Sequence, residues 1–556
     1  MTEETDLSVL RWVEEAVGPR LLAYLLGCDL DSLQLVVSGD RQPTDKQIEI
    51  IKAFSGLRKG IPEELDEASH KELICLWLVQ VGDDDRSVAR SMHEHTGGIE
   101  EIPPGQDDLE RALLGLAVDA YPAFLLPPDR IPMPPDEDIS FRLSSLLHHH
   151  PQAVVFSYAA LSDPVLQRVF AEENEHTGRT VMIYRNTGSG STVQLSMMPD
   201  TLLRTAWRRL RDGDHSPSAL AVEAIKELRL ARDVLAGKDR TIIAKLAFAG
   251  VLLPTDSRLE LRDGIVRPVT EADRRIVPES LKGQLSGTDA SGNSTTINYD
   301  GDVILEYKLP YKVRVEQFSQ THPPWPKDMR PPAAFNRTAT WLRFSLMLAV
   351  EREPRAQLVP TWRYFDEPLI QGSSLSWNDP RQGTGIMPTQ LSDAELTAWG
   401  EWYERLSDAR VDRIELALSR ILRAIAERRE PSDVLVDSVI AWESLFGSIE
   451  GELRFRITSS LAILLEGSYQ ARKDFRKRLS DIYRLRSKVV HGSGKLKESE
   501  YPRCQEALAV AIDAIRVLIT ERPDILELPD GAERSIALLL QDSSAPVTRT
   551  DGIPGE

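Results

Sequence analysis

From residue 392 onward, apolar residues recur at the spacing of helices that bury one face. Gly447, Gly467 and Gly492 follow three of these apolar segments, where helix C-termini favour glycine, and Pro431 suits a first helical turn. The pattern predicts an α-helical bundle over residues 391–530, with helices at residues 393–407, 410–429, 432–447, 452–466, 471–491 and 500–520.

The first 65 residues predict a small helical domain with tight turns. Segments 20–27, 30–37 and 44–54 are similar to a helix-turn-helix of the phage-repressor-like class, whose recognition helix would begin near Asp31. Residues 31–37 contain no Arg or Lys to contact phosphates. DNA binding and the docking of a regulatory partner therefore both stay open for residues 1–65.

Two stretches dense in proline, at residues 121–138 and 323–332, divide the middle of the chain, because proline interrupts helices and central strands. The expected class is multidomain α+β. After the N-terminal domain we expect a helical segment with a proline-rich linker, a mixed α/β domain of unknown role, a transitional segment, the bundle and a disordered tail, at residues 66–138, 139–335, 336–390, 391–530 and 541–556.

Within the mixed domain, apolar runs predict a β-α-β unit, from a strand at 153–157, a helix at 163–173 and a strand at 180–184. Helix is predicted from 201 to 250, and antiparallel strands at 264–269 and 294–315. Residues 187–192 are rich in Gly and Ser but lack the lysine and helix of a phosphate-binding loop, so a turn before a strand is expected. His148, His149 and His150 lack partner ligands at metal spacing and predict an exposed helix end.

Composition narrows the function. The formal charge of −19 over 556 residues disfavours a protein that coats nucleic acid or membrane, so any nucleic-acid site must be local. The three cysteines form no metal-type pair, and no metal or cofactor is expected. The acidic N-terminus and the lack of a long apolar run predict a cytoplasmic protein that does not bind membranes.

The predicted helix 471–491 carries the main candidate site. At about 100° per residue, its core stripe consists of Phe475, Leu479, Ile482, Leu485 and Val489. Arg484 and His491 lie on the opposite side, whereas Arg486 falls at the edge of the stripe and needs an acceptor there. Glu443 on a neighbouring predicted helix is the expected partner of Arg486. The helix and its flank are basic although the chain is acidic, with Arg472, Lys473, Arg476, Lys477, Arg478, Arg484, Arg486, Lys488, Lys495 and Lys497.

The run from Arg486 to His491 has the Arg, four residues, His arrangement of the HEPN ribonuclease superfamily. Residues 435–446, 452–456 and 483–487 resemble its Apea-like branch, found in bacterial proteins linked to phage defence. The resemblance covers about residues 391–530. It implies a metal-independent endoribonuclease, with His491 as general base or acid and Arg486 stabilising charge on the phosphate. Glu443, Tyr483, Arg484 and Lys488 would support the site, the two basic residues, Arg484 and Lys488, by holding RNA phosphates.

Family members usually build the site from two copies at a dimer interface, so a homodimer through the bundle is expected. Helix geometry agrees, because side chains five residues apart diverge by about 140° on a straight helix, unless the helix ends at Gly492 and lets His491 swing. The resemblance also suggests a role in defence or growth arrest, with upstream domains that sense a trigger. Two alternatives remain: a catalytically silent bundle that dimerises or binds RNA, and a DNA-binding regulator acting through residues 20–54.

Overall fold

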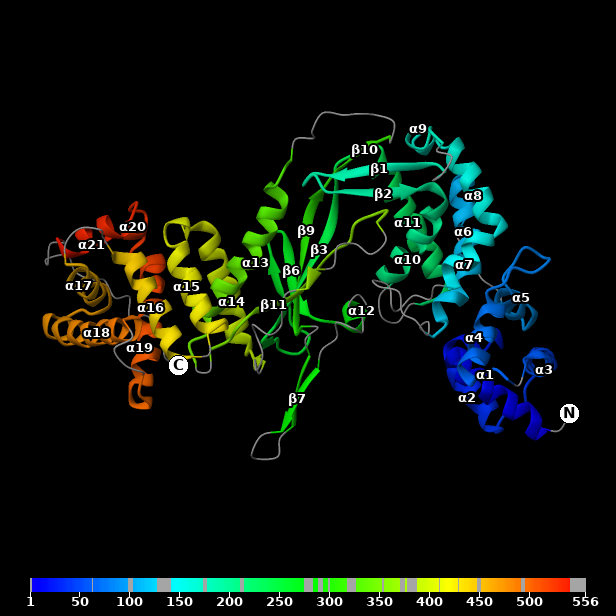
Figure 1. Ribbon diagram of the computed structural model, residues 1–556, viewed down its shortest axis with the longest axis horizontal. Helices are drawn as coiled ribbons and strands as arrows, with labels where there is room; N and C mark the ends of the chain where they lie inside the picture. The colour runs from blue at the N-terminus through cyan, green and yellow to red at the C-terminus, as the bar shows by residue number, and fades with distance from the viewer. Residues whose placement is uncertain are drawn as a thin grey trace, which may run out of the picture.

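The chain has a mixed α+β fold in a computed structural model. The molecule is elongated, with the N-terminal helices at one end, sheets in the middle and the C-terminal helices at the other end (Figure 1). The structure describes residues 3–62, 64–98, 104–127, 142–173, 178–210, 215–274, 284–288, 294–298, 301–317, 327–352, 355–370, 376–377, 388–409, 411–428, 430–447, 452–491 and 496–540. The predicted disordered tail, residues 541–556, lies outside them.

The three predicted N-terminal segments are helical. They correspond to the end of α1 (Glu3–Leu25), to α2 (Leu30–Ser38) and to α3 (Asp45–Gly60). Side chains cap the last two helices, because Asp29 accepts from the Ser32 N–H and Thr44 forms a capping box with Gln47. Helices α4 (Glu67–Leu78) and α5 (Val88–His95) follow in the predicted helical segment.

The predicted linker at 121–138 is wrong at its start, because α6 (Asp108–Leu125) continues through Pro122. Most of this helix is buried, including Tyr121 and Phe124, and it packs against α1, α8 and α11. Burial of an apolar helix on several sides outweighs the hydrogen bond that proline removes. Residues 128–141 lie outside the described residues.

The predicted β-α-β unit is also wrong. Residues 153–157 belong to α8 (Pro151–Ser162), which follows α7 (Arg142–His149), and the helix predicted at 163–173 is only α9 (Leu166–Val169). Pro151 occupies the first turn of α8, where its missing N–H costs little. His150 is buried at the N-cap of α8 and not exposed, with its imidazole 3.3 Å from Asp119.

The strand predicted at 180–184 is present as β1 (Thr180–Arg185). It pairs antiparallel with β2 (Gly190–Gln194) and with β10 (Val313–Glu316) in a three-stranded sheet, as Figure 1 shows. The Gly- and Ser-rich stretch forms the turn into β2, as expected. A short 3₁₀ turn, η1 (Leu195–Met197), replaces the end of the strand expected there.

Helix is confirmed after residue 200 only as far as α10 (Met198–Arg209) and α11 (Pro217–Leu235). Residues 240–249 form β3 (Arg240–Ala249) instead, whose alternate residues from Ile242 to Phe248 are buried. Strand β3 pairs antiparallel with β9 (Val303–Tyr311) and with β11 (Val359–Phe365). In the described residues these three strands form the middle of a six-stranded sheet. Its other strands are β12 (Ser376–Trp377), next to β11, and β6 (Gly264–Pro268) and β5 (Leu259–Leu261), beyond β9.

Smaller elements complete this region. The predicted antiparallel strands at 264–269 and 294–315 are borne out by β6, β8, β9 and β10. The short elements are α12 (Glu271–Arg274), a hairpin of β7 (Gln284–Thr288) with β8 (Ser294–Asn298), and β4 (Val251–Leu252) paired with β13 (Thr389–Gln390).

The segment expected to be transitional contains α13 (Arg330–Ala349), which joins two cores. Phe335 and Leu342 belong to the core of the sheet region, whereas Phe344 and Met347 belong to the core of the bundle. Helix α14 (Asp393–Asp408) packs beside α13, and the indole N–H of Trp399 donates to the Leu342 carbonyl at 3.0 Å. Residue 391 is therefore not a break in packing.

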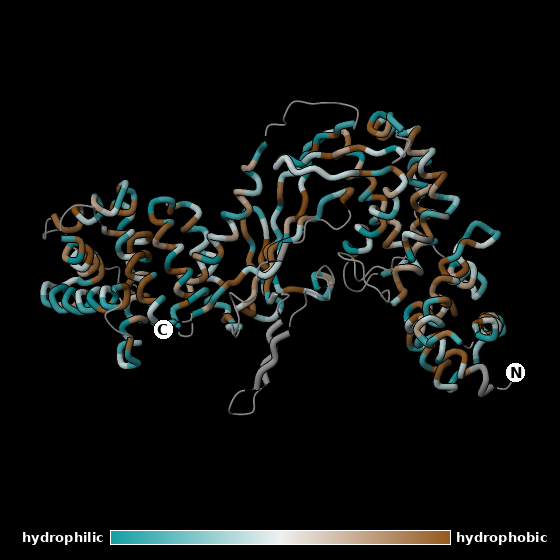
Figure 2. The backbone as a smooth tube through the Cα atoms, in the orientation of Figure 1, coloured by the Kyte–Doolittle hydropathy of each residue, from teal (hydrophilic) through white to brown (hydrophobic). Residues whose placement is uncertain are grey.

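All six helices predicted after residue 392 are present. After α14 they are α15 (Glu415–Ala426), α16 (Pro431–Phe446), α17 (Leu453–Leu465), α18 (Tyr469–Val490) and α19 (Tyr501–Thr520), with short turns η4 (Val411–Arg413) and η5 (Glu498–Glu500). Their buried apolar residues form one core, and Figure 2 shows that α18 is largely hydrophilic along its length.

The bundle extends beyond the predicted end at 530. Helices α20 (Pro523–Leu526) and α21 (Gly531–Leu539) pack onto it, and the Arg534 guanidinium is buried. Arg534 donates to the carbonyls of Leu445 at 2.8 Å and Leu528 at 3.1 Å, and thereby fixes the C-terminal end of α16. A buried guanidinium is stable there because carbonyl acceptors surround it.

Candidate active site

Helix α18 presents the predicted core stripe. Its N-cap Ser468 accepts from the Ala471 N–H at 3.2 Å, and Phe475, Leu479, Ile482 and Leu485 are buried against the bundle. The helix ends at Val490, and the His491 N–H donates to the Ser487 carbonyl at 3.0 Å. Gly492 lies outside the described residues.

A carboxylate on α16 holds two side chains of α18. Glu443 Oε2 accepts from the Arg486 guanidinium at 3.3 Å, and Glu443 Oε1 accepts from the Tyr483 hydroxyl at 2.6 Å. The predicted contact between Glu443 and Arg486 is therefore confirmed. The hydrogen bond from Tyr483 was not predicted, because the sequence indicates packing of this side chain in preference to stacking on a base and gives it no polar partner.

Tyr483 both packs and donates. Its side chain is buried in the bundle core, and burial together with the hydrogen bond to Glu443 raises the pKa of the phenol. Tyr483 therefore stays a neutral donor over the physiological pH range. The shared carboxylate thus fixes the position of Arg486 relative to the core.

Arg486 retains donors for a further acceptor. Only one of its nitrogens contacts Glu443, and its Nε–H is buried without a hydrogen-bond partner among the described residues. An unsatisfied buried donor costs about 1–3 kcal/mol, and more where the group is charged. The side chain is 20% exposed, so an anion from outside would meet the part of the guanidinium that Glu443 does not hold, and not the buried Nε.

His491 lies apart from Arg486. Its imidazole is exposed at the end of α18 and makes no hydrogen bond or ion pair with any residue in the described part of the chain. Five residues correspond to about 7.5 Å along a helix axis and a rotation of about 140°. One copy of the bundle therefore does not bring the two side chains into contact.

The other two predicted site residues face acidic neighbours. Arg484 is exposed and contacts Asp481 at 2.7 Å, and the Lys488 ammonium lies 3.7 Å from Glu500. Exposed pairs of this kind contribute about 0–1 kcal/mol, so a phosphate could displace either carboxylate. Arg484 is exposed and Lys488 half-buried, and each lies two positions from Arg486 on α18, so neither side chain faces Arg486 along the helix.

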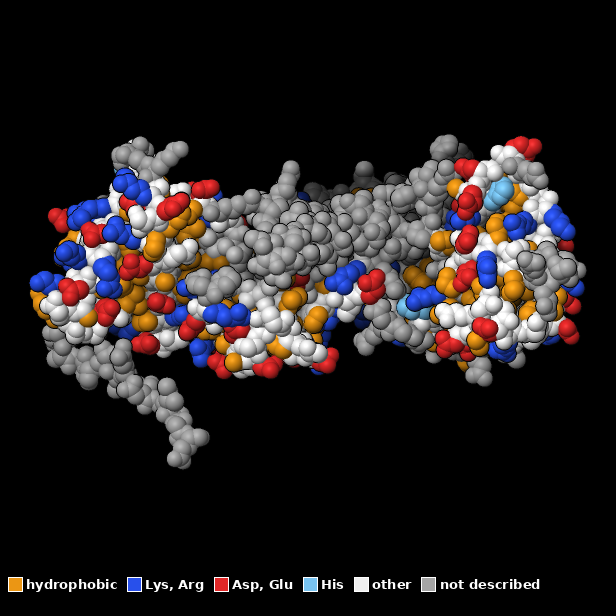
Figure 3. Space-filling view, turned by 90° about the horizontal axis from the view of Figure 1, so that it is seen from below, with side chains coloured by type: hydrophobic (Ala, Val, Ile, Leu, Met, Phe, Trp, Pro, Cys, Tyr) orange, Lys and Arg blue, Asp and Glu red, His pale blue; other side chains and the backbone are white. Residues whose placement is uncertain are grey.

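The outer face of α18 is basic and exposed. Lys473 and Lys477 are exposed and make no ion pair with any described residue, whereas Arg476 and Arg478 lie over the rings of Phe455 and Phe475. Figure 3 shows lysine and arginine side chains spread over the bundle at this end of the molecule. This face attracts anions although the chain as a whole is acidic.

Comparison of the chain with family models, with curated proteins and with solved structures finds no match. Among the described residues, no group of three or more His, Cys, Asp or Glu side chains is arranged to hold a metal ion. Over the same residues, no one helix is long and apolar enough to cross a membrane. One pair of helices, Leu7–Leu25 with Leu30–Ser38, is long and apolar enough when the two are taken together, but it bends by 117° between them.

Proposed function

We propose that the C-terminal bundle is a metal-independent endoribonuclease of the HEPN type, in which Arg486 and His491 act on one RNA phosphate. The observation that carries this proposal is the state of Arg486. Glu443 anchors one terminal nitrogen of its guanidinium, and the side chain is still 20% exposed. In this proposal a phosphate oxygen binds the exposed part of the guanidinium that Glu443 does not hold.

The chemistry needs only these side chains and the RNA. His491 takes the proton of the 2′-hydroxyl as its oxygen attacks phosphorus, and the bond to the 5′-oxygen breaks. The imidazolium of His491 that results gives its proton to the leaving 5′-oxygen. Arg486 stabilises the negative charge on the phosphate oxygens. The products are a 2′,3′-cyclic phosphate and a 5′-hydroxyl.

Two copies of the bundle complete the site in this proposal. Arg486 lies within α18 and His491 at its C-cap, and the angle of about 140° between residues five apart on a helix favours a site shared by two copies. We therefore place Arg486 of one copy beside His491 of the other.

The biological role follows from the same resemblance. RNA cleavage by this bundle would arrest growth, as expected for a defence protein, and the regions before residue 391 would restrain or trigger it. The alternative that residues 20–54 make the chain a DNA-binding regulator gains no support from α2, which carries no Arg or Lys. Loss of salt-dependent DNA binding on deletion of residues 1–65 would favour that alternative.

A catalytically silent bundle is the second candidate. It is favoured by the partial neutralisation of Arg486 by Glu443, and of Lys488 by Glu500. The deciding experiment measures cleavage of RNA in EDTA by the full chain, His491→Ala and Arg486→Ala, with His70→Ala, a partly exposed histidine on α4 outside the bundle, as the control. We expect both site variants to lose at least about a hundredfold in rate while the control keeps its activity. Equal cleavage by all four proteins removes the site from the mechanism, and none by any favours the silent bundle.

A further inference from the structure

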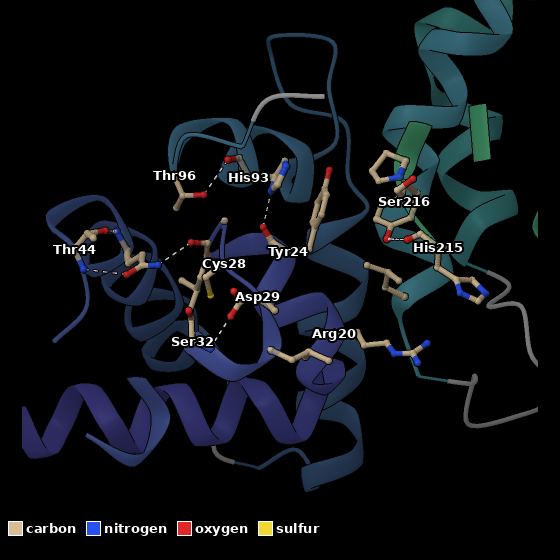
Figure 4. A pocket seen from close by; sticks show the side chains of 18 of the residues that line it. Arg20, Tyr24, Cys28, Asp29, Ser32, Thr44, His93, Thr96, His215 and Ser216 are labelled. Atoms are coloured by element: carbon tan, nitrogen blue, oxygen red, sulfur yellow. Dashed lines mark hydrogen bonds between the residues drawn. The ribbon is translucent and has the colours of Figure 1, made fainter. Parts of the chain in front are cut away.

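A cleft far from the bundle lies where the N-terminal helices meet α6 and the start of α11. Its volume is about 1040 Å³, and its lining includes Arg20, Tyr24, Cys28, Arg41, Tyr121 and His215 (Figure 4). Pockets for small molecules commonly measure about 300–1,000 Å³. The cleft is therefore large enough for a ligand of several rings or phosphates.

The charged side chains of this cleft favour an anion. Arg20 is exposed and makes no hydrogen bond or ion pair with any described residue, and Arg41 donates only to the Ser32 hydroxyl, at 3.1 Å. Asp29 is the one carboxylate among the described lining residues, and it accepts from the Ser32 N–H at 2.7 Å. The cleft thus has two guanidinium groups and one carboxylate, which caps α2. This makes the cleft locally positive in a chain of charge −19.

Aromatic rings from both sides form the inner wall of the cleft. Tyr24 stacks on His93 with ring centroids 3.9 Å apart, and the Tyr121 ring lies 5.4 Å from Tyr24. The Tyr121 hydroxyl donates to the His215 carbonyl and thereby fixes α6 against the start of α11. Figure 4 shows Tyr24 and Arg20 projecting from α1 toward the side that carries His215 and Ser216. Tyr24 and Tyr121 line the cleft but are only 9% and 6% exposed, so they offer a planar ligand a narrow apolar surface beside the arginines.

We propose that this cleft binds a nucleotide, with its phosphates on Arg20 and Arg41 and its base against the aromatic wall. A cation is a poor ligand because the described lining has two arginines for one carboxylate. An apolar ligand would make no use of the two guanidiniums, which are exposed at the cleft. The inference stands apart from the proposed ribonuclease, because it uses none of the residues of the bundle.

Calorimetric titration of the full chain tests the proposal with ATP, AMP, adenosine and pyrophosphate as probes. We expect ATP to bind more tightly than adenosine or pyrophosphate, because only ATP engages both the arginines and the rings. The double variant Arg20→Gln with Arg41→Gln should bind ATP at least about tenfold more weakly, because each substitution removes a charge-assisted hydrogen bond to a phosphate. Arg11→Gln, an exposed arginine also on α1 but outside the cleft, should leave the affinity unchanged.

The same titration can overturn the proposal. Absence of ATP binding at 1 mM does so, as does an affinity that the double substitution leaves unchanged. Pyrophosphate binding as tightly as ATP would make the cleft a simple anion site and would equally reject a nucleotide.

Cys28 gives a second readout in the unaltered protein. Cys28 is half-buried and lines the cleft, whereas Cys75 and Cys504 are buried elsewhere. Burial raises the pKa of the Cys28 thiol, so alkylation is best followed at about pH 9, where more thiolate forms. We expect ATP to slow labelling of Cys28 at least about fivefold in the full chain and to have no such effect in the double variant. Unchanged labelling in saturating ATP contradicts the proposal.

Discussion

Glu443 on α16 and Arg486 on α18 lie 3.3 Å apart, and the same carboxylate also accepts a hydrogen bond from Tyr483. The pair joins two helices whose sequences are about 40 residues apart, and it sets the direction of a guanidinium that sequence places at the edge of the core. The proposed ribonuclease depends on this relationship, because a mobile arginine would not meet a phosphate in one geometry.

Glu443→Gln should lower the rate of RNA cleavage by about tenfold while KM changes little. The amide keeps the shape of the side chain but loses the charge that orients Arg486, so the effect falls on the transition state. Steady-state kinetics measure the split between kcat and KM. Glu506→Gln is the matched control, because Glu506 on α19 lies 3.4 Å from Arg478, another arginine of α18. An equal loss of cleavage rate in both variants would show that any lost ion pair on α18 lowers the rate, and would contradict a specific role of Glu443 in positioning Arg486.

Lys473→Gln with Lys477→Gln should weaken RNA binding and flatten its salt dependence. Both lysines are exposed on the outer face of α18. If each neutralises one phosphate, the slope of log K against log salt should fall in magnitude by about 1.4 for single-stranded RNA. Filter binding at several salt concentrations checks this, with Lys226→Gln on α11 as the control. An unchanged slope would remove this face from the RNA path.

Glu227→Gln should remove the part of the pH dependence of folding stability that comes from the protonation of Glu227. Glu227 is buried, and the single guanidinium of Arg209 contacts both Glu227 and Asp366. Burial raises the pKa of Glu227 to about 8. Between about pH 4.5 and 8 the folded state therefore holds a proton that the unfolded state releases, so the free energy of unfolding falls as pH rises.

Urea unfolding at pH 5.5, 6.5 and 7.5 measures this effect. The decline should be steeper in the full chain than in Glu227→Gln, and Glu260→Gln, an exposed carboxylate on β5, should behave like the unaltered chain. If the free energy of unfolding fell equally with pH in all three proteins, the proton would be bound by a group other than Glu227.

The helical wheel predicted much of α18, because a long amphipathic pattern overrides local ambiguity. Phe475, Leu479, Ile482 and Leu485 are buried as expected, and Arg486 has the acceptor that its place on the wheel required. The hydrogen bond between Tyr483 and Glu443 was not accessible in the same way. It depends on how α16 packs against α18, which periodicity within one segment does not determine.

Short apolar runs were less informative. Residues 153–157 are β-branched and aromatic enough to predict a strand, yet Pro151 and the packing of α8 on α6 make them helical. Residues 240–249 continue a helical pattern but pair with β9 and β11 over their length. In both cases contacts distant in sequence decided the structure.

The arrangement of Arg486 and His491 across two copies is the central claim, and subunit mixing tests it most directly. Arg486→Ala and His491→Ala chains, each inactive alone, are mixed under conditions that allow exchange, and RNA cleavage in EDTA is measured. A heterodimer then holds one site with both residues intact and one with neither. Random exchange makes half of the dimers heterodimers, so activity should recover to about a quarter of that of the unaltered chain. A mixture that exchanges, as mass measurement of tagged chains can show, and yet stays as inactive as its components would contradict the claim.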